Sequence, residues 1–163
     1  MESSETSWRS LLGLSTHIKD RCIEEVGALA AEVGLTKLEI VAERFWGLPD
    51  GDDPDGWRGI RETLDRHSLN PFAHSTYIEM NMASLNSRLR EAALCQTFRC
   101  LELASYLKAE YLVVHPGNLN RNYPVSLLPE ARACLRESLE LLCVKAQAAG
   151  MTIALENGWN GEN

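Results

Sequence analysis

The segment from Tyr111 to Gly117, with the sequence YLVVHPG, decides the fold. Its apolar run stops at a His followed by Pro and Gly, a pattern typical of a buried strand whose last inward side chain is His115. Because side chains alternate along a strand, Val113 lies on the same face as His115, and Leu112 and Val114 lie on the other face. Apolar residues on both faces predict a strand of a parallel α/β sheet that is buried on both sides.

Two other segments end on a polar side chain in the same way. The segment NPFAH (residues 70–74) closes on His74, and the segment MTIALEN (residues 151–157) carries Glu156 at the position that corresponds to His115. Parallel strands end at one edge of their sheet. We therefore expect two His side chains and one Glu side chain to meet at one rim.

Strand and helix patterns alternate along the chain. Strands are predicted at residues 10–15, 37–42, 70–74, 111–115 and 151–157, and helices at residues 20–33, 54–67, 86–107 and 128–149. Asp20 and either Asn86 or Ser87 are predicted to cap helices, and Gly34 and Gly150 to end them. This order fits an open doubly wound sheet or a β/α barrel. Polar residues at the ends of three successive strands favour the barrel, whose sites lie at that rim.

Apolar residues at helical spacing predict the packed side of each helix. They are Ile23, Val26, Ala30 and Val33 in the first helix, Trp57, Ile60 and Leu64 in the second, Leu89, Ala93, Cys100, Leu103 and Leu107 in the third, and Leu135, Leu139, Leu142 and Ala146 in the fourth. In the strand at residues 37–42, alternation places Leu38 and Ile40 on one face and Glu39, Val41 and Glu43 on the other. A buried carboxylate needs a partner, so both Glu side chains are predicted either in a pocket or in a hydrogen bond inside the barrel.

Composition limits the classes of function. The chain has 163 residues, of which 45% are hydrophobic and 24% charged, with a formal net charge of −7 and a pI of about 5.1. This acidic balance makes nucleic acid a disfavoured partner. No run approaches the roughly 18 apolar residues of a membrane span. Residues 1–9 are polar and are predicted to form a flexible tail before a single domain at residues 10–163.

The cysteines predict a reduced protein. They are odd in number and show neither a CxxC pair nor zinc-finger spacing: Cys22, Cys95, Cys100, Cys134 and Cys143. We interpret them as packing thiols and predict a cytoplasmic location.

Loop and rim residues give further candidates. The loop at residues 44–55 is rich in Gly, Pro and Asp and contains Trp46, which is predicted to contact the substrate because long loops with aromatic residues often shape pockets. Trp159 is a second aromatic candidate. His17 and His67 are interpreted as hydrogen-bonded residues rather than as ligands.

Three sequence pieces resemble the xylose-isomerase-like TIM-barrel superfamily. They are AHSTYIEMN (residues 73–81), LVVHPGN (residues 112–118) and IALENG (residues 153–158), and the likeness extends over residues 11–157. This superfamily contains sugar-phosphate isomerases and epimerases together with the apurinic endonucleases of AP endonuclease family 2. The resemblance implies a (β/α)8 barrel.

The resemblance also implies roles for individual residues. His74, His115 and Glu156 match metal-ligand positions of the endonuclease branch, and Glu156 matches a metal-binding carboxylate of the isomerase branch. We therefore predict a divalent metal ion, either Mn, Mg, Co or Zn, held by these three residues. Glu156 and His115 are predicted to be catalytic, and His74, Trp46 and Asn157 to bind the substrate.

The sequence departs from the superfamily in its number of βα units. Members have eight units in about 250 residues, and their later strands supply further ligands and a second catalytic carboxylate. This sequence corresponds to about the first five units. It is interpreted as a fragment, a truncation product or a partial barrel that a second chain completes.

Three functions follow as hypotheses. The first is a metal-dependent isomerase or epimerase that moves a proton between adjacent carbons of a small sugar or sugar phosphate. The second is an apurinic-site endonuclease, which the HxxY and HPG pieces favour and the acidic charge and the missing ligands oppose. The third is a non-catalytic partial barrel that only binds a partner or a small ligand.

The strand count predicts association. Five parallel strands cannot close an eight-stranded barrel, so the first and last strands are expected to have unpaired backbone groups. Val41, Val113 and Ala154 are expected to lie on an open inner face. We therefore predict that the chain self-associates or binds a complementary half-barrel.

Overall fold

The computed structural model describes residues 11–18, 21–44 and 54–157. In these ranges five strands alternate with four α-helices: β1 (Gly13–Ser15), α1 (Ile23–Glu32), β2 (Lys37–Val41), α2 (Pro54–Arg66), β3 (Asn70–His74), α3 (Ser87–Leu107), β4 (Tyr111–Val114), α4 (Leu128–Ala148) and β5 (Thr152–Leu155). Two short 3-10 helices, η2 (Ala42–Arg44) and η3 (Val125–Leu127), follow β2 and precede α4. The predicted tail at residues 1–9 lies outside the described residues.

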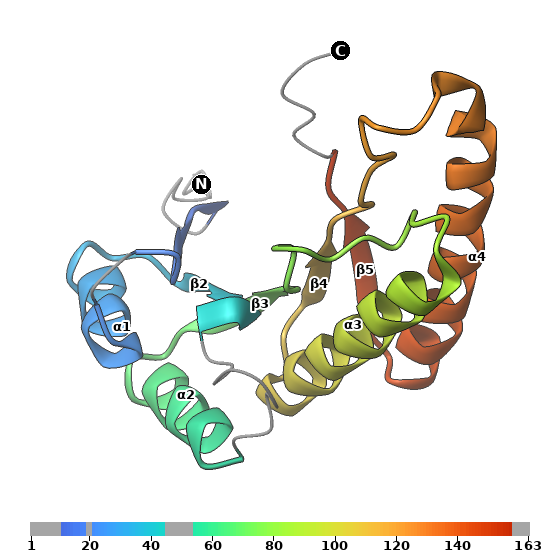
Figure 1. Cartoon of the computed structure of the whole chain (residues 1–163). Coiled ribbons are helices and arrows are strands. Elements are labelled where there is room, and N and C mark those ends of the chain that lie inside the picture. Colours follow the sequence, from blue (N-terminus) through green and yellow to red (C-terminus); the bar gives the residue numbers. More distant parts are fainter. Residues whose placement is uncertain (1–10, 19–20, 45–53, 158–163) are drawn as a thin grey trace, which may run out of the picture.

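The strands form one parallel sheet in the order of the sequence. Each of β1 to β4 pairs with the strand that follows it, and the order is β1-β2-β3-β4-β5. A doubly wound sheet reverses its strand order at a switch point, whereas a (β/α)8 barrel adds its strands consecutively. In Figure 1 the four helices lie along one side of the sheet, in an arc from α1 to α4. The predicted fold class, five βα units of a TIM-barrel type, is confirmed.

The hydrophobic core lies between the helices and the outer face of the sheet. Leu38 and Ile40 of β2 and Leu112 and Val114 of β4 have no exposed surface. The helices contribute a matching set of buried residues: Val26, Ala30, Ile60, Leu64, Ala93, Cys100, Leu103, Leu107, Leu142 and Ala146. Full burial of one Leu or Ile side chain contributes about 1.5–3 kcal/mol, so this layer dominates the stability of the fold.

The inner face of β4 is less buried than its outer face. Tyr111 and Val113 are only partly buried, so the prediction that both faces of β4 are buried is wrong. Within the described residues, side chains of neighbouring strands cover this face, as where the rings of Phe72 and Tyr111 stack at 5.2 Å. Ala154, which is expected on an open inner face, is half-buried. Val41 is instead only 3% exposed, so it does not lie on an open face; it lines the cavity at the strand ends.

Several predicted helix ends are confirmed. The side-chain oxygen of Asn86 accepts the N–H of Arg88 at 3.1 Å and caps α3. Gly34 and Gly150 have φ angles of 76° and 66° at the ends of α1 and α4. The predicted cap Asp20 lies outside the described residues. The N-cap of α1 is Cys22, which replaces the predicted start of that helix.

Periodicity overestimates the packed sides at the helix ends. Val33 follows the last residue of α1 and is exposed, and Leu89 is exposed in the first turn of α3. Both positions continue the apolar spacing past the region that the sheet covers. The packing-thiol interpretation holds for Cys100, which is buried, but not for the other free cysteines that are exposed: Cys22, Cys95 and Cys143.

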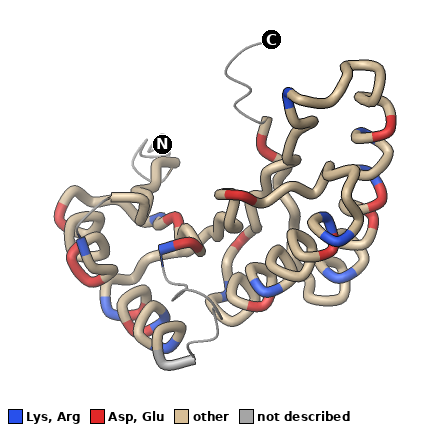
Figure 2. The backbone as a smooth tube through the Cα atoms, viewed as in Figure 1, with Lys and Arg blue, Asp and Glu red and all other residues tan. Residues whose placement is uncertain are grey.

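The helices carry charged residues of both signs and have no membrane-spanning character in the described part of the chain. Figure 2 shows Lys and Arg interspersed with Asp and Glu along the helices. Within the described residues, none of the helices combines the length and the apolar character needed to cross a lipid bilayer.

Candidate metal-binding active site

The rim of the sheet brings three of the predicted site residues together. His74 is the last residue of β3, and His115 and Glu156 each follow the last residue of their strand. The backbone continues its pairing beyond the strands, because the N–H of Glu156 donates to the carbonyl of Val114 at 3.0 Å. The parallel register therefore fixes the places where these side chains leave the backbone.

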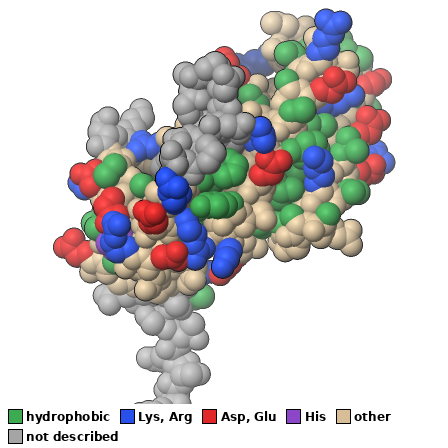
Figure 3. Space-filling view, turned by 90° about the horizontal axis from the view of Figure 1, so that it is seen from below, with side chains coloured by type: hydrophobic (Ala, Val, Ile, Leu, Met, Phe, Trp, Pro, Cys, Tyr) green, Lys and Arg blue, Asp and Glu red, His purple; other side chains and the backbone are tan. Residues whose placement is uncertain are grey.

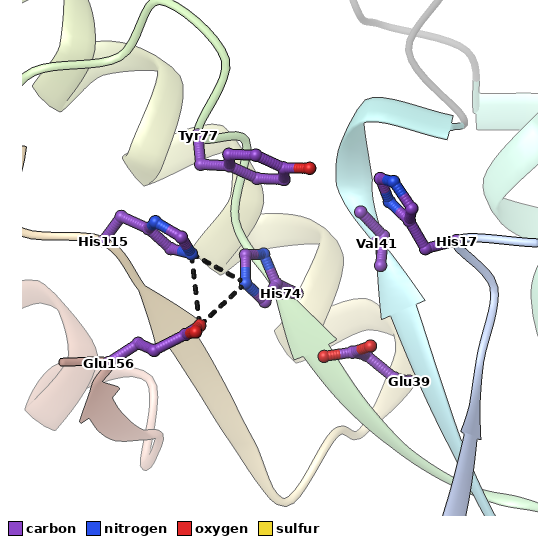
Figure 4. Close-up of a pocket in the computed structure, with 7 residues that line it drawn as sticks. All are labelled: His17, Glu39, Val41, His74, Tyr77, His115 and Glu156. Carbon is purple, nitrogen blue, oxygen red and sulfur yellow. Dashed lines mark hydrogen bonds and ion pairs between the residues drawn. The ribbon is translucent and has the colours of Figure 1, made fainter. Parts of the chain in front are cut away.

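Their polar atoms form a small triangle. The Nε2 atoms of His74 and His115 lie 3.2 Å apart, and the Oε2 atom of Glu156 lies 3.3 Å from the first and 3.1 Å from the second. Figure 4 shows the three side chains pointing toward one another from successive strands. The side chain of His74 is 10% exposed and that of Glu156 is 45% exposed, so the triangle opens toward solvent on its Glu156 side.

The tautomer of His74 determines whether its Nε2 atom can donate a hydrogen bond within the triangle. The Nδ1 atom of His74 lies 2.7 Å from the carbonyl oxygen of Ser75, which can only accept, so the proton sits on Nδ1. In that tautomer the Nε2 atom of His74 presents a lone pair to Glu156, and an ionised Glu156 also presents only acceptors. A cation in the triangle would satisfy these facing acceptors.

The donor set fits a divalent metal ion. Three ligand atoms around a tetrahedral ion with bonds of about 2.0–2.2 Å lie roughly 3.3–3.6 Å from one another. The observed separations of 3.1–3.3 Å are close to this spacing. A backbone carbonyl that holds the other imidazole nitrogen, as Ser75 holds His74, is the usual support of a metal-binding His. His74, His115 and Glu156 are thus able to hold one ion.

A cavity of about 320 Å³ adjoins the triangle. Seven residues line it: His17, Glu39, Val41, His74, Tyr77, His115 and Glu156. This volume is at the lower end of the range for small-molecule sites. The cavity combines two carboxylates, three imidazoles and one phenol, which suits a small polar ligand.

Tyr77 is a site residue that the sequence reasoning did not assign. Its ring stacks on His115 with centroids 4.8 Å apart and planes at 18°, and it meets the edge of His74 at 5.5 Å. Burial, followed by the charges of Glu43, Glu156 and Glu39, raises the pKa of Tyr77, so its phenol is neutral at pH 7. The signal was present in the HxxY pattern, which places a Tyr three residues after His74.

Comparison with known proteins identifies the family. The family model described as "Xylose isomerase-like TIM barrel" matches residues 27–163. The chain belongs to the xylose isomerase-like TIM-barrel family. The uncharacterized protein MJ1311 of Methanocaldococcus jannaschii is 31% identical over 130 residues, which cover 78% of this chain and 42% of that protein.

Solved structures share this fold. A D-tagatose 3-epimerase-like protein has a TM-score of 0.74 and 24% identity over 91% of this chain and 54% of that one. A D-psicose 3-epimerase crystallised in the presence of D-fructose has a TM-score of 0.76 and 15% identity over 93% and 53%. The chain thus spans about half the length of these solved structures.

The two carboxylates predicted for the inner face of this xylose isomerase-like chain have different surroundings. Glu39 lines the cavity. Glu43 instead accepts the backbone N–H groups of Tyr77 and Ile78, at 2.7 and 2.6 Å. The two predicted alternatives, a pocket and an interior hydrogen bond, are thus each realised by one residue.

The remaining candidates of this xylose isomerase-like chain lie apart from the triangle. His67 contacts Glu24 on α1, at 2.9 Å, in agreement with its interpretation as a hydrogen-bonded residue. His17 lines the cavity, with its ring 6.3 Å from that of Tyr77. Asn157 is exposed and is not among the described residues that line the cavity. Trp46 and Trp159 lie outside the described residues.

Proposed function

We propose that the protein is a metal-dependent isomerase or epimerase that acts on a small sugar or sugar phosphate. The observation that carries the proposal is the triangle of His74, His115 and Glu156, which opens into a cavity at the strand ends. Enzymes with this barrel place their sites at the same rim. A D-psicose 3-epimerase and a D-tagatose 3-epimerase-like protein among the structural neighbours support the class of reaction.

The three residues would hold one divalent ion through two imidazole nitrogens and one carboxylate oxygen. Imidazole ligands suit zinc and neighbouring transition metals, whereas magnesium prefers oxygen ligands, so the donor set favours Zn or Co over Mg. When bound, such an ion supplies a Lewis acid that polarises a carbonyl or hydroxyl oxygen of the sugar.

The protein side chains would orient the substrate and move its proton. Glu156 contacts both imidazoles through Oε2, which leaves Oε1 to accept a proton from the substrate. His115 is the second candidate for proton transfer, and the backbone carbonyl of Ser75 holds His74 in one tautomer. The Tyr77 ring packs against both imidazoles, stacked on that of His115 and edge-on to that of His74.

Acid–base chemistry at a carbon atom can be detected by hydrogen exchange with the solvent. When a base removes a proton from carbon and returns it, solvent hydrogen enters the sugar. We therefore expect the 163-residue chain, loaded with Zn²⁺ or Co²⁺ in D2O, to incorporate deuterium into a ketohexose or its phosphate, as followed by NMR.

A pair of variants tests whether this exchange takes place at the site formed by His74, His115 and Glu156. The Glu156→Gln variant should lower the exchange rate at least about 100-fold, because removal of a catalytic acid or base costs about that much. The Glu79→Gln variant removes the same charge from an exposed residue of the loop after β3 and should leave the rate unchanged. A folded, metal-loaded chain that exchanges no hydrogen in any tested sugar would contradict the proposal.

A further inference from the structure

We propose that Glu43 is a positioning residue of the His74, His115 and Glu156 site, and that it acts through Tyr77. The part of this inference that concerns metal affinity rests on the proposed function. The part that concerns the orientation of the imidazoles depends only on the contacts of the described residues.

Glu43 holds the loop that follows β3. It lies in η2, immediately after β2, and one carboxylate oxygen, Oε1, accepts the N–H groups of Tyr77 and Ile78 at 2.7 and 2.6 Å. Hydrogen bonds to an ionised acceptor are about twice as strong as neutral ones. The two bonds join residues 34 and 35 positions apart in the sequence, so they fix the backbone of Tyr77 to the end of the neighbouring strand.

The other carboxylate oxygen of Glu43, Oε2, is in an energetically unfavourable position. Its Oε2 atom is buried and has no hydrogen-bond partner in the described part of the chain. A buried polar atom without a partner opposes folding. The protein nevertheless keeps the Glu43 carboxylate in this position, where Oε1 accepts the N–H groups of Tyr77 and Ile78. We infer that the role of this carboxylate is to position Tyr77.

His115 depends on Tyr77 for its orientation more than His74 does. A backbone carbonyl, that of Ser75, accepts the Nδ1–H of His74 and fixes that ring. Within the described residues, the Nδ1 atom of His115 has no comparable hydrogen bond, and the nearest ring to it is the stacked Tyr77, with centroids 4.8 Å apart. Rotation of His115 out of the triangle would separate the two rings.

The contacts therefore form one continuous series from β2 to β4. Glu43 holds Tyr77, Tyr77 stacks on His115, and His115 presents Nε2 to His74 and Glu156. Residues that orient metal ligands in this way typically change metal affinity by 10–100-fold when they are removed.

Two measurements test this series in the 163-residue chain. The first is the NMR shift of the His115 ring protons without metal, because a stacked Tyr ring moves these resonances upfield. The second is the affinity for Co²⁺, measured by absorption titration with Co²⁺ alone. Glu43→Ala should remove the upfield shift and weaken Co²⁺ binding about tenfold.

Three further variants sharpen the test. Glu43→Gln keeps a carbonyl oxygen for both N–H groups and should largely retain the upfield shift, which also provides a folded variant if Glu43→Ala does not fold. Glu79→Gln, the matched exposed control in the same loop, should change neither measurement. In a double-mutant cycle, Glu43→Ala should weaken Co²⁺ binding in the wild-type chain and have little further effect in the Tyr77→Leu variant.

The outcomes separate this inference from the proposed function. A retained upfield shift in folded Glu43→Ala, or additive effects in the cycle, would overturn the positioning role. If the wild-type chain binds no Co²⁺ but Glu43→Ala still loses the shift, the positioning role stands and the proposed metal-dependent function fails.

Discussion

The side chain of Asn81 pairs with the backbone of Asn118 as a neighbouring strand would. Its amide nitrogen donates to the carbonyl of Asn118 at 2.8 Å, and its Oδ1 atom accepts the N–H of Asn118 at 3.1 Å. Oδ1 also accepts the N–H of Ala83 at 3.0 Å. One side chain thus ties the loop after β3 to the loop after β4, which carries His115.

Gly117 makes this contact possible, and its replacement should be costly. Its φ angle is +79°, and a Cβ atom on it would lie 2.2 Å from Oδ1 and 3.0 Å from Cα of Asn81. We expect Gly117→Ala to lower the free energy of unfolding by about 1–3 kcal/mol, because backbone strain and a steric clash add. Urea denaturation followed by circular dichroism measures this change.

Gly150→Ala is the matched control for Gly117→Ala. Gly150 also has a positive φ angle, +66°, but a Cβ atom there would meet nothing within 4 Å. Its replacement should cost only the strain of the left-handed conformation, about 1 kcal/mol. If the two variants lose equal stability, the clash with Asn81 makes no contribution.

Glu24 joins α1 to α2 and should make the stability depend on pH. Its carboxylate accepts hydrogen bonds from Thr63 and Arg66 of α2 and from His67, which follows that helix. The bonds from His67 and then Arg66 are the largest causes that lower the pKa of Glu24 from 4.5 to about 2. The ionised form is therefore favoured in the folded state, and its stabilising effect is complete above pH 4.5 and lost as pH falls toward 2.

The variant Glu24→Gln tests this pH dependence. We expect a lower free energy of unfolding than wild type at pH 7, with a difference that shrinks as the pH falls from 4.5 toward 2. Urea titrations at several pH values measure it. Glu32→Gln removes a charge from an exposed residue of the same helix and should show little change at any pH. A constant difference between Glu24→Gln and wild type at every pH would contradict this role.

The sequence predicted the strands and the rim residues because both depend on local patterns. The apolar runs that end at His74, His115 and Glu156 are visible as alternation and end signals, and parallel pairing then places the ends side by side. The family resemblance rested on the same three segments and is confirmed by the match to residues 27–163.

Contacts between loops were not predictable in the same way. Tyr77 stacks on His115, and Glu43 from another βα unit accepts the backbone N–H of Tyr77. No spacing within one segment of the sequence shows such contacts. Leu89 shows a second limit of sequence patterns. Apolar spacing predicts it on the packed side of its helix, but this spacing continues into the first turn of α3, where Leu89 is exposed.

The predicted association remains a proposal, and the arrangement of the strands supports it. Within the described sheet, β1 and β5 each have one neighbouring strand, and Leu155 at the end of β5 is 49% exposed. Leu141 and Val144 of α4 are also exposed, and Figure 3 shows hydrophobic side chains between charged ones on the side where α3 and α4 lie. We propose that the 163-residue chain self-associates or binds a complementary half-barrel.

Light scattering coupled to size exclusion measures this association. We expect a mass above that of one 18.2 kDa chain at tens of micromolar, and a shift toward the monomer when Val144 and Leu155 are replaced by Lys. A monodisperse monomer that unfolds cooperatively would refute self-association.

The metal content of the purified chain and of its Glu156→Ala variant tests the central claim most directly. Elemental analysis after dialysis against Zn²⁺ or Co²⁺ should give about one ion per wild-type chain, since His74, His115 and Glu156 supply three ligands to one site. Glu156→Ala should lose most of this metal, whereas Glu79→Ala, an exposed control, should retain it. Equal metal content in wild type and a folded Glu156→Ala variant would contradict the assignment of the site.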